Sequence, residues 1–283
     1  MPFRLATKDA RAVLVTDAGL YDLERHSGGK LPSDPMEAIA HHAELHAVAA
    51  GLGGSPDAVY DVDALGICVP RPQKIFGIGL NYRAHAEESQ MEIPPNPLVF
   101  CKFANCLASA TDDIIVYGPT TDWEAELVVV LGSRARDIPE EEAWNHVAGL
   151  TCGQDVSERG TQFASKPPHF DLGKSFDTFG PIGPCVVSPD QLADPSNLHL
   201  TCDVNGERKQ DTRTDDLIFG IPALVSYISG ICTLEPGDLI FTGTPSGVGF
   251  LSGQFLQPGD VVTTTIEGLG TMTNRCVARE AQA

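Results

Sequence analysis

The fold is decided by one stretch, Asp122-Trp123-Glu124-Ala125-Glu126-Leu127-Val128-Val129-Val130-Leu131-Gly132. Its second half is an unbroken run of apolar, mostly β-branched residues, which predicts a strand buried on both faces. Side chains alternate along a strand, so Glu124 and Glu126 share one face with Val128 and Val130. If that face is buried, two carboxylates point inward, side by side, where the strand begins.

Two neighbouring carboxylates repel each other, and each is costly to remove from water. A divalent cation would offset both costs, and oxygen ligands suit Mg²⁺ or Mn²⁺. The alternative is that the strand leaves the core at Ala125, with both glutamates solvated or paired to Lys or Arg. From this stretch alone, both interpretations stay open.

Composition limits the classes of partner. The chain has 283 residues, which allows one large domain or one large and one small domain. Its net charge of -19 argues against nucleic acid or an anionic membrane as partner. The eight cysteines form no CxxC pair, which argues against a zinc ribbon and favours buried free thiols in a reducing cytosol. No apolar run is long enough for a signal peptide or a membrane span, so we expect a cytoplasmic protein.

The N-terminal part predicts a small separate unit over residues 1–70, followed by the main domain over 71–283. Asp17-Ala18-Gly19 lies between two strand-like runs and indicates a hairpin. Residues 34–49 read as one amphipathic helix. Pro70-Arg71-Pro72 then marks a linker.

His85 and Glu88 follow a predicted strand over 74–80. They are three residues apart, so on a helical turn they face the same side. A carboxylate beside a histidine holds its tautomer and raises its basicity, which suits a general base. The alternative is a solvated polar turn. The segment 83–93 has few apolar residues and is typical of a mobile lid.

Three later segments also carry candidate groups. A predicted strand over 149–156 delivers Asp155 to its end. Lys174 lies in a loop dense in Gly and Pro, where a lysine often contacts an anion; a surface lysine is the alternative. The glycines of 243–249 can expose backbone N–H groups to a carboxylate, or form a plain tight turn. Residues 217–233 predict a helix that Pro222 either kinks or begins.

Five motifs in this order resemble the C-terminal catalytic domain of the fumarylacetoacetate hydrolase family. They are Gly79-Leu-Asn-Tyr-Arg-Ala-His85, Asp122-Trp-Glu-Ala-Glu-Leu127, Gly153-Gln-Asp-Val-Ser-Glu-Arg159, Gly173-Lys-Ser-Phe-Asp-Thr-Phe-Gly-Pro-Ile-Gly-Pro184 and Gly237-Asp-Leu-Ile-Phe-Thr-Gly-Thr-Pro-Ser-Gly-Val-Gly249. The resemblance spans about residues 74–277, and residues 1–70 are similar to the small variable N-terminal domain of such proteins. It implies an α+β, mainly β fold, a mixed β-sheet roll, usually assembled as a homodimer.

The resemblance also assigns roles. It implies a metal ion, usually Mg²⁺ with Mn²⁺ or Ca²⁺ as alternatives, held by Glu124, Glu126 and Asp155. It implies that His85 and Glu88 activate water from a lid, and that Lys174 contacts the substrate oxyanion. Substrate-binding positions are implied at Arg83, Arg159, Gln162 and Thr244. Two departures are Gly160, where relatives often have Asp, and Lys166-Pro-Pro-His-Phe170, which we expect to depend on the substrate.

The function expected from these residues is hydrolysis of the C3–C4 bond of a 2,4-diketo acid (an acylpyruvate), giving pyruvate and a second acid. The same site would support oxaloacetate decarboxylation, keto–enol tautomerisation, isomerisation or decarboxylation of a 2-hydroxy-diene-dioate, or a sugar-acid lyase reaction. The His–Glu pair favours hydrolysis, because the others need no attacking water. A metal-stabilised binding protein without turnover is the alternative from another class.

Overall fold

A computed structural model describes residues 1–280. Its main sheet has ten strands in the order β3-β2-β1-β12-β10-β9-β15-β4-β5, with β6 also paired to β12. The bounds are β1 Arg4–Lys8, β2 Arg11–Thr16, β3 Gly19–Asp22, β4 Ile75–Gly79, β5 Leu98–Lys102, β6 Leu107–Ala108, β9 Ala125–Leu131, β10 Val147–Gln154, β12 Gly180–Val187 and β15 Leu239–Phe241. Mixed pairing with a predominance of antiparallel strands confirms the expected α+β, mainly β class.

The predicted central strand is β9, and every one of its residues is buried. It pairs antiparallel with β10 on one side and β15 on the other. In this register Glu126 lies opposite Gly153, and Ala125 lies opposite Gln154. The β-branched run therefore forms the interior of the sheet, as expected of a strand covered on both faces.

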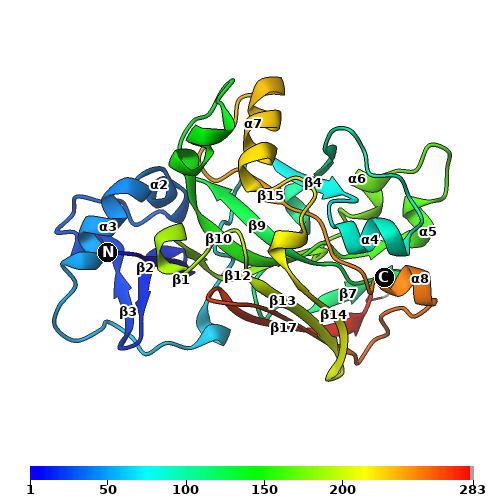
Figure 1. Cartoon of the computed structure of the whole chain (residues 1–283). Helices are drawn as coiled ribbons and strands as arrows, with labels where there is room; N and C mark the ends of the chain where they lie inside the picture. Colours follow the sequence, from blue (N-terminus) through cyan, green and yellow to red (C-terminus); the bar gives the residue numbers. More distant parts are fainter. Residues whose placement is uncertain (281–283) are drawn as a thin grey trace.

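A second sheet packs against β9, β10 and β12, and lies below them in Figure 1. Its order is β14-β13-β16-β17-β7, with bounds β7 Ile114–Val116, β13 His199–Val204, β14 Glu207–Arg213, β16 Val261–Ile266 and β17 Gly270–Ala278. The β13–β14 turn is Asn205-Gly206, both at positive φ, as a two-residue hairpin requires. A small separate pair joins β8 Thr121–Asp122 to β11 Ser157–Glu158.

The N-terminal strands continue the main sheet, because β1 pairs antiparallel with β12 and sets Leu5 opposite Val186. The hairpin is confirmed as β2 and β3. The helix expected over 34–49 is two helices, α2 Pro35–Ala40 and α3 His42–Ala50, because His41 leaves the helical region. A domain boundary near residue 70 remains a prediction.

Short helices gather at the side opposite the N-terminal unit (Figure 1). They are α4 Arg83–Glu88, α5 Arg159–Gln162, α6 Phe170–Gly173 and α8 Gly249–Ser252; the remaining helices are α1 Leu23–His26 and α7 Ile221–Ile231, and the 3₁₀ turns are Val62–Ala64, Ala104–Cys106, Glu140–His146, Pro189–Gln191 and Thr214–Asp216. Pro222 lies in the first turn of α7, where its missing N–H costs nothing. Within residues 1–280, no helix is both long and apolar enough to cross a bilayer.

Candidate metal centre

Three buried carboxylates, Glu124, Glu126 and Asp155, converge where β9 begins and β10 ends. Each offers one oxygen, and these oxygens all lie within 4.8 Å of one another. Asp155 is the residue after β10, and its backbone N–H donates to the Glu124 carbonyl at 2.8 Å. That hydrogen bond continues the strand pairing past the last paired residues, so two adjacent strands supply all three side chains.

Two buried lysines compensate part of this charge. Lys174 Nζ donates to Glu124 Oε2 at 2.6 Å and to Asp155 Oδ2 at 2.8 Å. Lys102 Nζ donates to Asp155 Oδ1 at 2.6 Å and to the Phe179 carbonyl at 3.2 Å. Although burial opposes its charge, the neighbouring Asp155 raises the pKa of Lys102, so this side chain stays an ammonium. Asp155 therefore has a cation on each of its oxygens.

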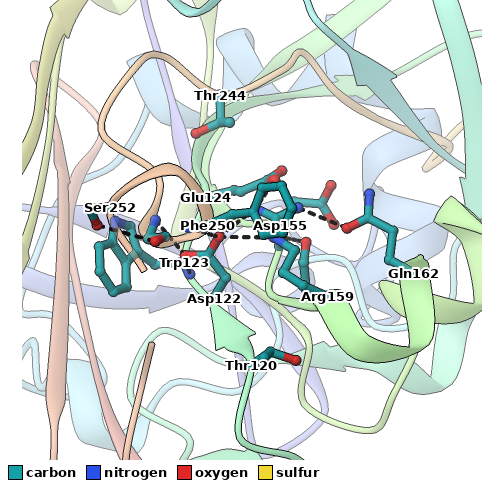
Figure 2. A network of polar contacts seen from close by, with 12 residues as sticks. Thr120, Asp122, Trp123, Glu124, Asp155, Arg159, Gln162, Thr244, Phe250 and Ser252 are labelled. Atoms are coloured by element: carbon teal, nitrogen blue, oxygen red, sulfur yellow. Dashed lines mark hydrogen bonds and ion pairs between the residues drawn. The ribbon is translucent and has the colours of Figure 1, made fainter. Parts of the chain in front are cut away.

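Arg159 adds a third buried cation on the other side of Glu124 (Figure 2). Its Nη2 donates to Glu124 Oε1 at 2.6 Å and to Asp122 Oδ2 at 2.7 Å. Its Nη1 donates to Gln162 Oε1 at 2.9 Å. Asp122 in turn accepts backbone N–H groups from Gly249 at 2.7 Å and Phe250 at 2.9 Å, which ties the start of α8 to the centre.

The two glutamates differ sharply in their surroundings. Burial alone would raise the pKa of Glu124, but Lys174 and Arg159 lower it to about 2. Burial, together with the charges of Asp155 and Glu124, raises the pKa of Glu126 well above its usual value. In the part of the chain the structure describes, Glu126 has no salt-bridge partner, and its Oε2 accepts only the Gly243 N–H at 2.7 Å. A buried oxygen donor set with one uncompensated carboxylate fits a hard divalent cation.

The predicted His–Glu pair lies on α4. His85 Nδ1 is 3.4 Å from Glu88 Oε2, and the Gly247 N–H donates to Glu88 at 3.3 Å. The Gly247 carbonyl accepts Trp123 Nε1–H at 3.0 Å, so the loop that holds the pair is tied to the residue before Glu124. Within residues 1–280, no hydrogen bond joins His85 to the three carboxylates, and its catalytic role stays a prediction.

The substrate-binding predictions divide into two groups by position. Arg159 and Gln162 lie within the centre described above, and Thr244 lies beside it. Thr244 Oγ1 donates to the Ala125 carbonyl at 3.0 Å. Arg83 is turned elsewhere, because its guanidinium donates to the backbone carbonyls of residues 216 and 217 at 3.1 and 2.9 Å. Whether any of the four binds substrate remains a prediction.

Sequence reasoning missed four residues that build the centre. Lys102 follows the apolar run Leu98-Val-Phe-Cys101, and a charge at the end of such a run was the available signal. Asp122 was quoted in the deciding stretch without a role. Gln154 lies in a quoted motif without a role and Gln210 lies in none, yet their Oε1 atoms accept the N–H groups of Glu124 and Ala125, each at 2.9 Å. They satisfy backbone donors exposed where β9 begins, which only the tertiary structure reveals.

Comparison with known proteins gives a consistent result. The family model described as fumarylacetoacetate hydrolase, C-terminal, matches residues 74–277. The fumarylacetoacetate hydrolase domain-containing protein 2 homolog of Dictyostelium discoideum is 47% identical over 72% of this chain and 71% of its own length. Oxaloacetate tautomerase FAHD2B, mitochondrial, of Bos taurus is 42% identical over 74% of this chain and 68% of its own. The crystal structure of maleylpyruvate hydrolase from Sphingobium, in complex with manganese(II) and pyruvate, is 28% identical with a TM-score of 0.79, covering 98% of this chain and 100% of that one.

Proposed function

The chain belongs to the fumarylacetoacetate hydrolase family, and from that premise we propose that it is a divalent-cation-dependent hydrolase of 2,4-diketo acids. The products would be pyruvate and a second carboxylic acid. The proposal is supported most by the buried triad with its one uncompensated carboxylate, and by the pyruvate and manganese(II) in the maleylpyruvate hydrolase structure. A cytoplasmic location and a homodimer remain predictions.

We assign the cation, Mg²⁺ with Mn²⁺ or Ca²⁺ as alternatives, to Glu124, Glu126 and Asp155. When bound, such a cation supplies Lewis-acid polarisation of a 2-oxo acid and a template that orients it. Lys102 contributes by holding Asp155 Oδ1 at 2.6 Å, which fixes the rotation of that carboxylate. Of the three, Glu126 alone has no salt-bridge partner within residues 1–280, so cation affinity should depend most on this ligand.

His85 is the proposed general base. Glu88 fixes the ring by accepting from its Nδ1–H, and is itself fixed by the Gly247 N–H. The other ring nitrogen is then free to take a proton from water. Imidazole suits this step because histidine is the side chain used most often for general acid–base catalysis near neutral pH. The hydroxide so formed attacks C4 of the diketo acid.

Lys174 is the proposed oxyanion donor. An ammonium group has three N–H donors, and two of those on Lys174 are used by Glu124 and Asp155. The third can donate to the oxygen on C4 as its charge develops. When the C3–C4 bond breaks, its electron pair moves onto the C3 fragment, which becomes the enolate of pyruvate and takes up one proton. The C4 fragment leaves as the second acid.

Keto–enol tautomerisation of oxaloacetate is the second candidate, favoured by the 42% identical relative from Bos taurus, oxaloacetate tautomerase FAHD2B. This reaction moves a proton between C3 and the 2-oxo oxygen and consumes no water. Oxaloacetate and acylpyruvates share a C3 flanked by two carbonyl carbons, so one site can accept both. The candidates differ in whether a water-activating base is essential.

The test compares wild type with His85→Ala on an acylpyruvate and on oxaloacetate, with Mg²⁺, with Mn²⁺ and with EDTA. We expect His85→Ala to lower kcat for hydrolysis on the order of 10²–10⁴-fold while sparing oxaloacetate tautomerisation. Equal loss of both would remove the water-activating role. Tautomerisation without hydrolysis in the wild type would replace the first candidate by the second. His199→Ala is the control, since His199 also contacts a carboxylate, Asp211 at 2.7 Å, on the surface of the second sheet.

A further inference from the structure

Four phenylalanines form an arc, defined here as Phe100, Phe163, Phe170 and Phe250, beside the metal centre. Phe250 stacks on Phe163 with centroids 5.1 Å apart, Phe163 meets Phe170 at 6.4 Å, and Phe170 meets Phe100 at 5.8 Å. The members come from β5, the residue after α5, α6 and α8. Chain segments far apart in sequence therefore build one aromatic surface.

Both ends of the arc rest on cations of the centre. The Arg159 guanidinium lies 5.7 Å from the Phe250 ring, and the Lys174 ammonium lies 5.3 Å from the Phe100 ring. Arg159 and Lys174 each bind Glu124 at 2.6 Å. The contacts therefore lead from Glu124 through Arg159, the four rings and Lys174, and back to Glu124. Figure 2 shows Phe250 beside Arg159.

The rings are exposed although they pack against one another. Phe163, Phe170 and Phe250 keep 43%, 38% and 44% of their surface accessible. A single exposed apolar side chain needs no explanation, but a contiguous group of aromatic faces marks a binding site. We propose that the arc receives the substituent on C4 of the substrate, and that this substituent is an apolar chain or ring. The inference rests on the proposed function, because it places a diketo acid in the neighbouring centre.

The charges near the arc favour an apolar substituent over a carboxylated one. Arg159 makes four hydrogen bonds, to Asp122, Glu124 and Gln162, and has five N–H donors. Lys174 has three donors, and two of them donate to carboxylates. Lys166 and His169 lie on the loop between Phe163 and Phe170, and both are exposed to solvent. A distal carboxylate held by that loop is therefore the rival, and the test includes it.

The experiment measures binding by titration calorimetry with Mg²⁺ present, so it needs no turnover. The matched probes are 2-oxobutanoate and 2-oxo-4-phenylbutanoate, which share the 2-oxo acid end and lack the 4-carbonyl needed for hydrolysis. We expect the phenyl compound to bind at least about 10-fold more tightly to the wild type. In Phe163→Ala/Phe250→Ala this ratio should fall below about threefold, and Phe170→Ala should lower it independently.

Phe103→Ala is the matched control. Phe103 is 48% exposed and lies one residue beyond β5, where strand alternation places it on the face opposite Phe100. It should keep the wild-type ratio.

Three results would overturn the inference: equal affinity for both probes, tighter binding of the carboxylated 2-oxohexanedioate than of the phenyl compound, or an unchanged ratio in the double variant accompanied by a change in oligomeric mass. The last result would make the arc an interface between copies. A phenyl preference without hydrolysis of any diketo acid would refute the proposed function alone and support the subsite.

Discussion

Replacing Glu126 by glutamine should have opposite effects with and without a divalent cation. The side chain is buried, has no salt-bridge partner within residues 1–280, and accepts one backbone hydrogen bond, from Gly243. Glutamine has the same shape and still offers an oxygen to that N–H. It removes the charge that Asp155 and Glu124 repel. Without a cation the variant should therefore be more stable than wild type. Adding a divalent cation should stabilise the wild type but not the variant.

The size of the effect follows from the raised pKa of Glu126. A carboxyl group whose pKa is raised on folding contributes stability below its unfolded value, near 4.5, and loses it as the pH rises toward its folded value. Each unit by which the pKa is raised corresponds to about 1.4 kcal/mol, so the ionised Glu126 side chain lowers the free energy of unfolding at pH 7. Glutamine removes that cost. The advantage of the variant should accordingly disappear as the pH falls to about 4.5.

The assay is thermal unfolding at pH 7 in EDTA and in MgCl₂ or MnCl₂. At 100 times Kd the wild type gains about 2.7 kcal/mol, or roughly 5–11 °C in Tm. Glu126→Gln should show no such rise, and its Tm in EDTA should exceed that of wild type. Glu124→Gln is the contrasting variant. It leaves Lys174 and Arg159 without a buried partner, so its free energy of unfolding in EDTA should fall by about 3–5 kcal/mol, and its Tm should fall as well. A Glu126→Gln protein that keeps the Mg²⁺-dependent rise would refute the ligand assignment.

Three further predictions concern Lys102 at the centre and the Gly132–His42 contact at the far end of β9. Lys102→Met should destabilise the protein by about 3–5 kcal/mol in urea unfolding, because it leaves the buried Asp155 Oδ1 without its cation; an unchanged midpoint would contradict this. Gly132→Ala should cost about 1–3 kcal/mol in the same measurement, since a Cβ there would lie 2.5 Å from His42 Nδ1. Burial lowers the pKa of His42, so stability present above about pH 6.5 should be lost as the pH falls. His42→Gln should flatten that loss below about pH 6.5, and an equally steep profile would show that another group titrates.

The fold was predictable where one local signal dominated. The β-branched run gave β9 its place at the centre of the sheet, because no other structure buries such a run so well. Prediction failed where neighbouring structure decided. Residues 36–49 contain no glycine or proline, so no helix-breaking residue marks the break at His41.

The candidate site was predictable as a set of motifs, but its charge balance was not. Spacing brought Glu124 and Glu126 together on one strand, and helical spacing brought His85 to Glu88. Lys102 reaches Asp155 across 53 positions of sequence, and no local pattern could pair them. Long-range pairs of this kind depend on strand order, which a single sequence does not reveal.

The two interpretations that the deciding stretch left open, a metal site or salt-bridged glutamates, prove to be compatible. Glu124 has the salt bridges, to Lys174 and Arg159, and Glu126 has none in the described chain. Each arrangement depends on the other, because cations around Glu124 allow it to stay ionised beside a second buried carboxylate. Three cations, Lys102, Lys174 and Arg159, face four carboxylates, those of Asp122, Glu124, Glu126 and Asp155. A fourth cationic side chain at Glu126 would therefore neutralise the centre and weaken its attraction for a divalent ion. The missing partner of Glu126 is therefore what makes this cluster a candidate metal site rather than a buried salt-bridge network.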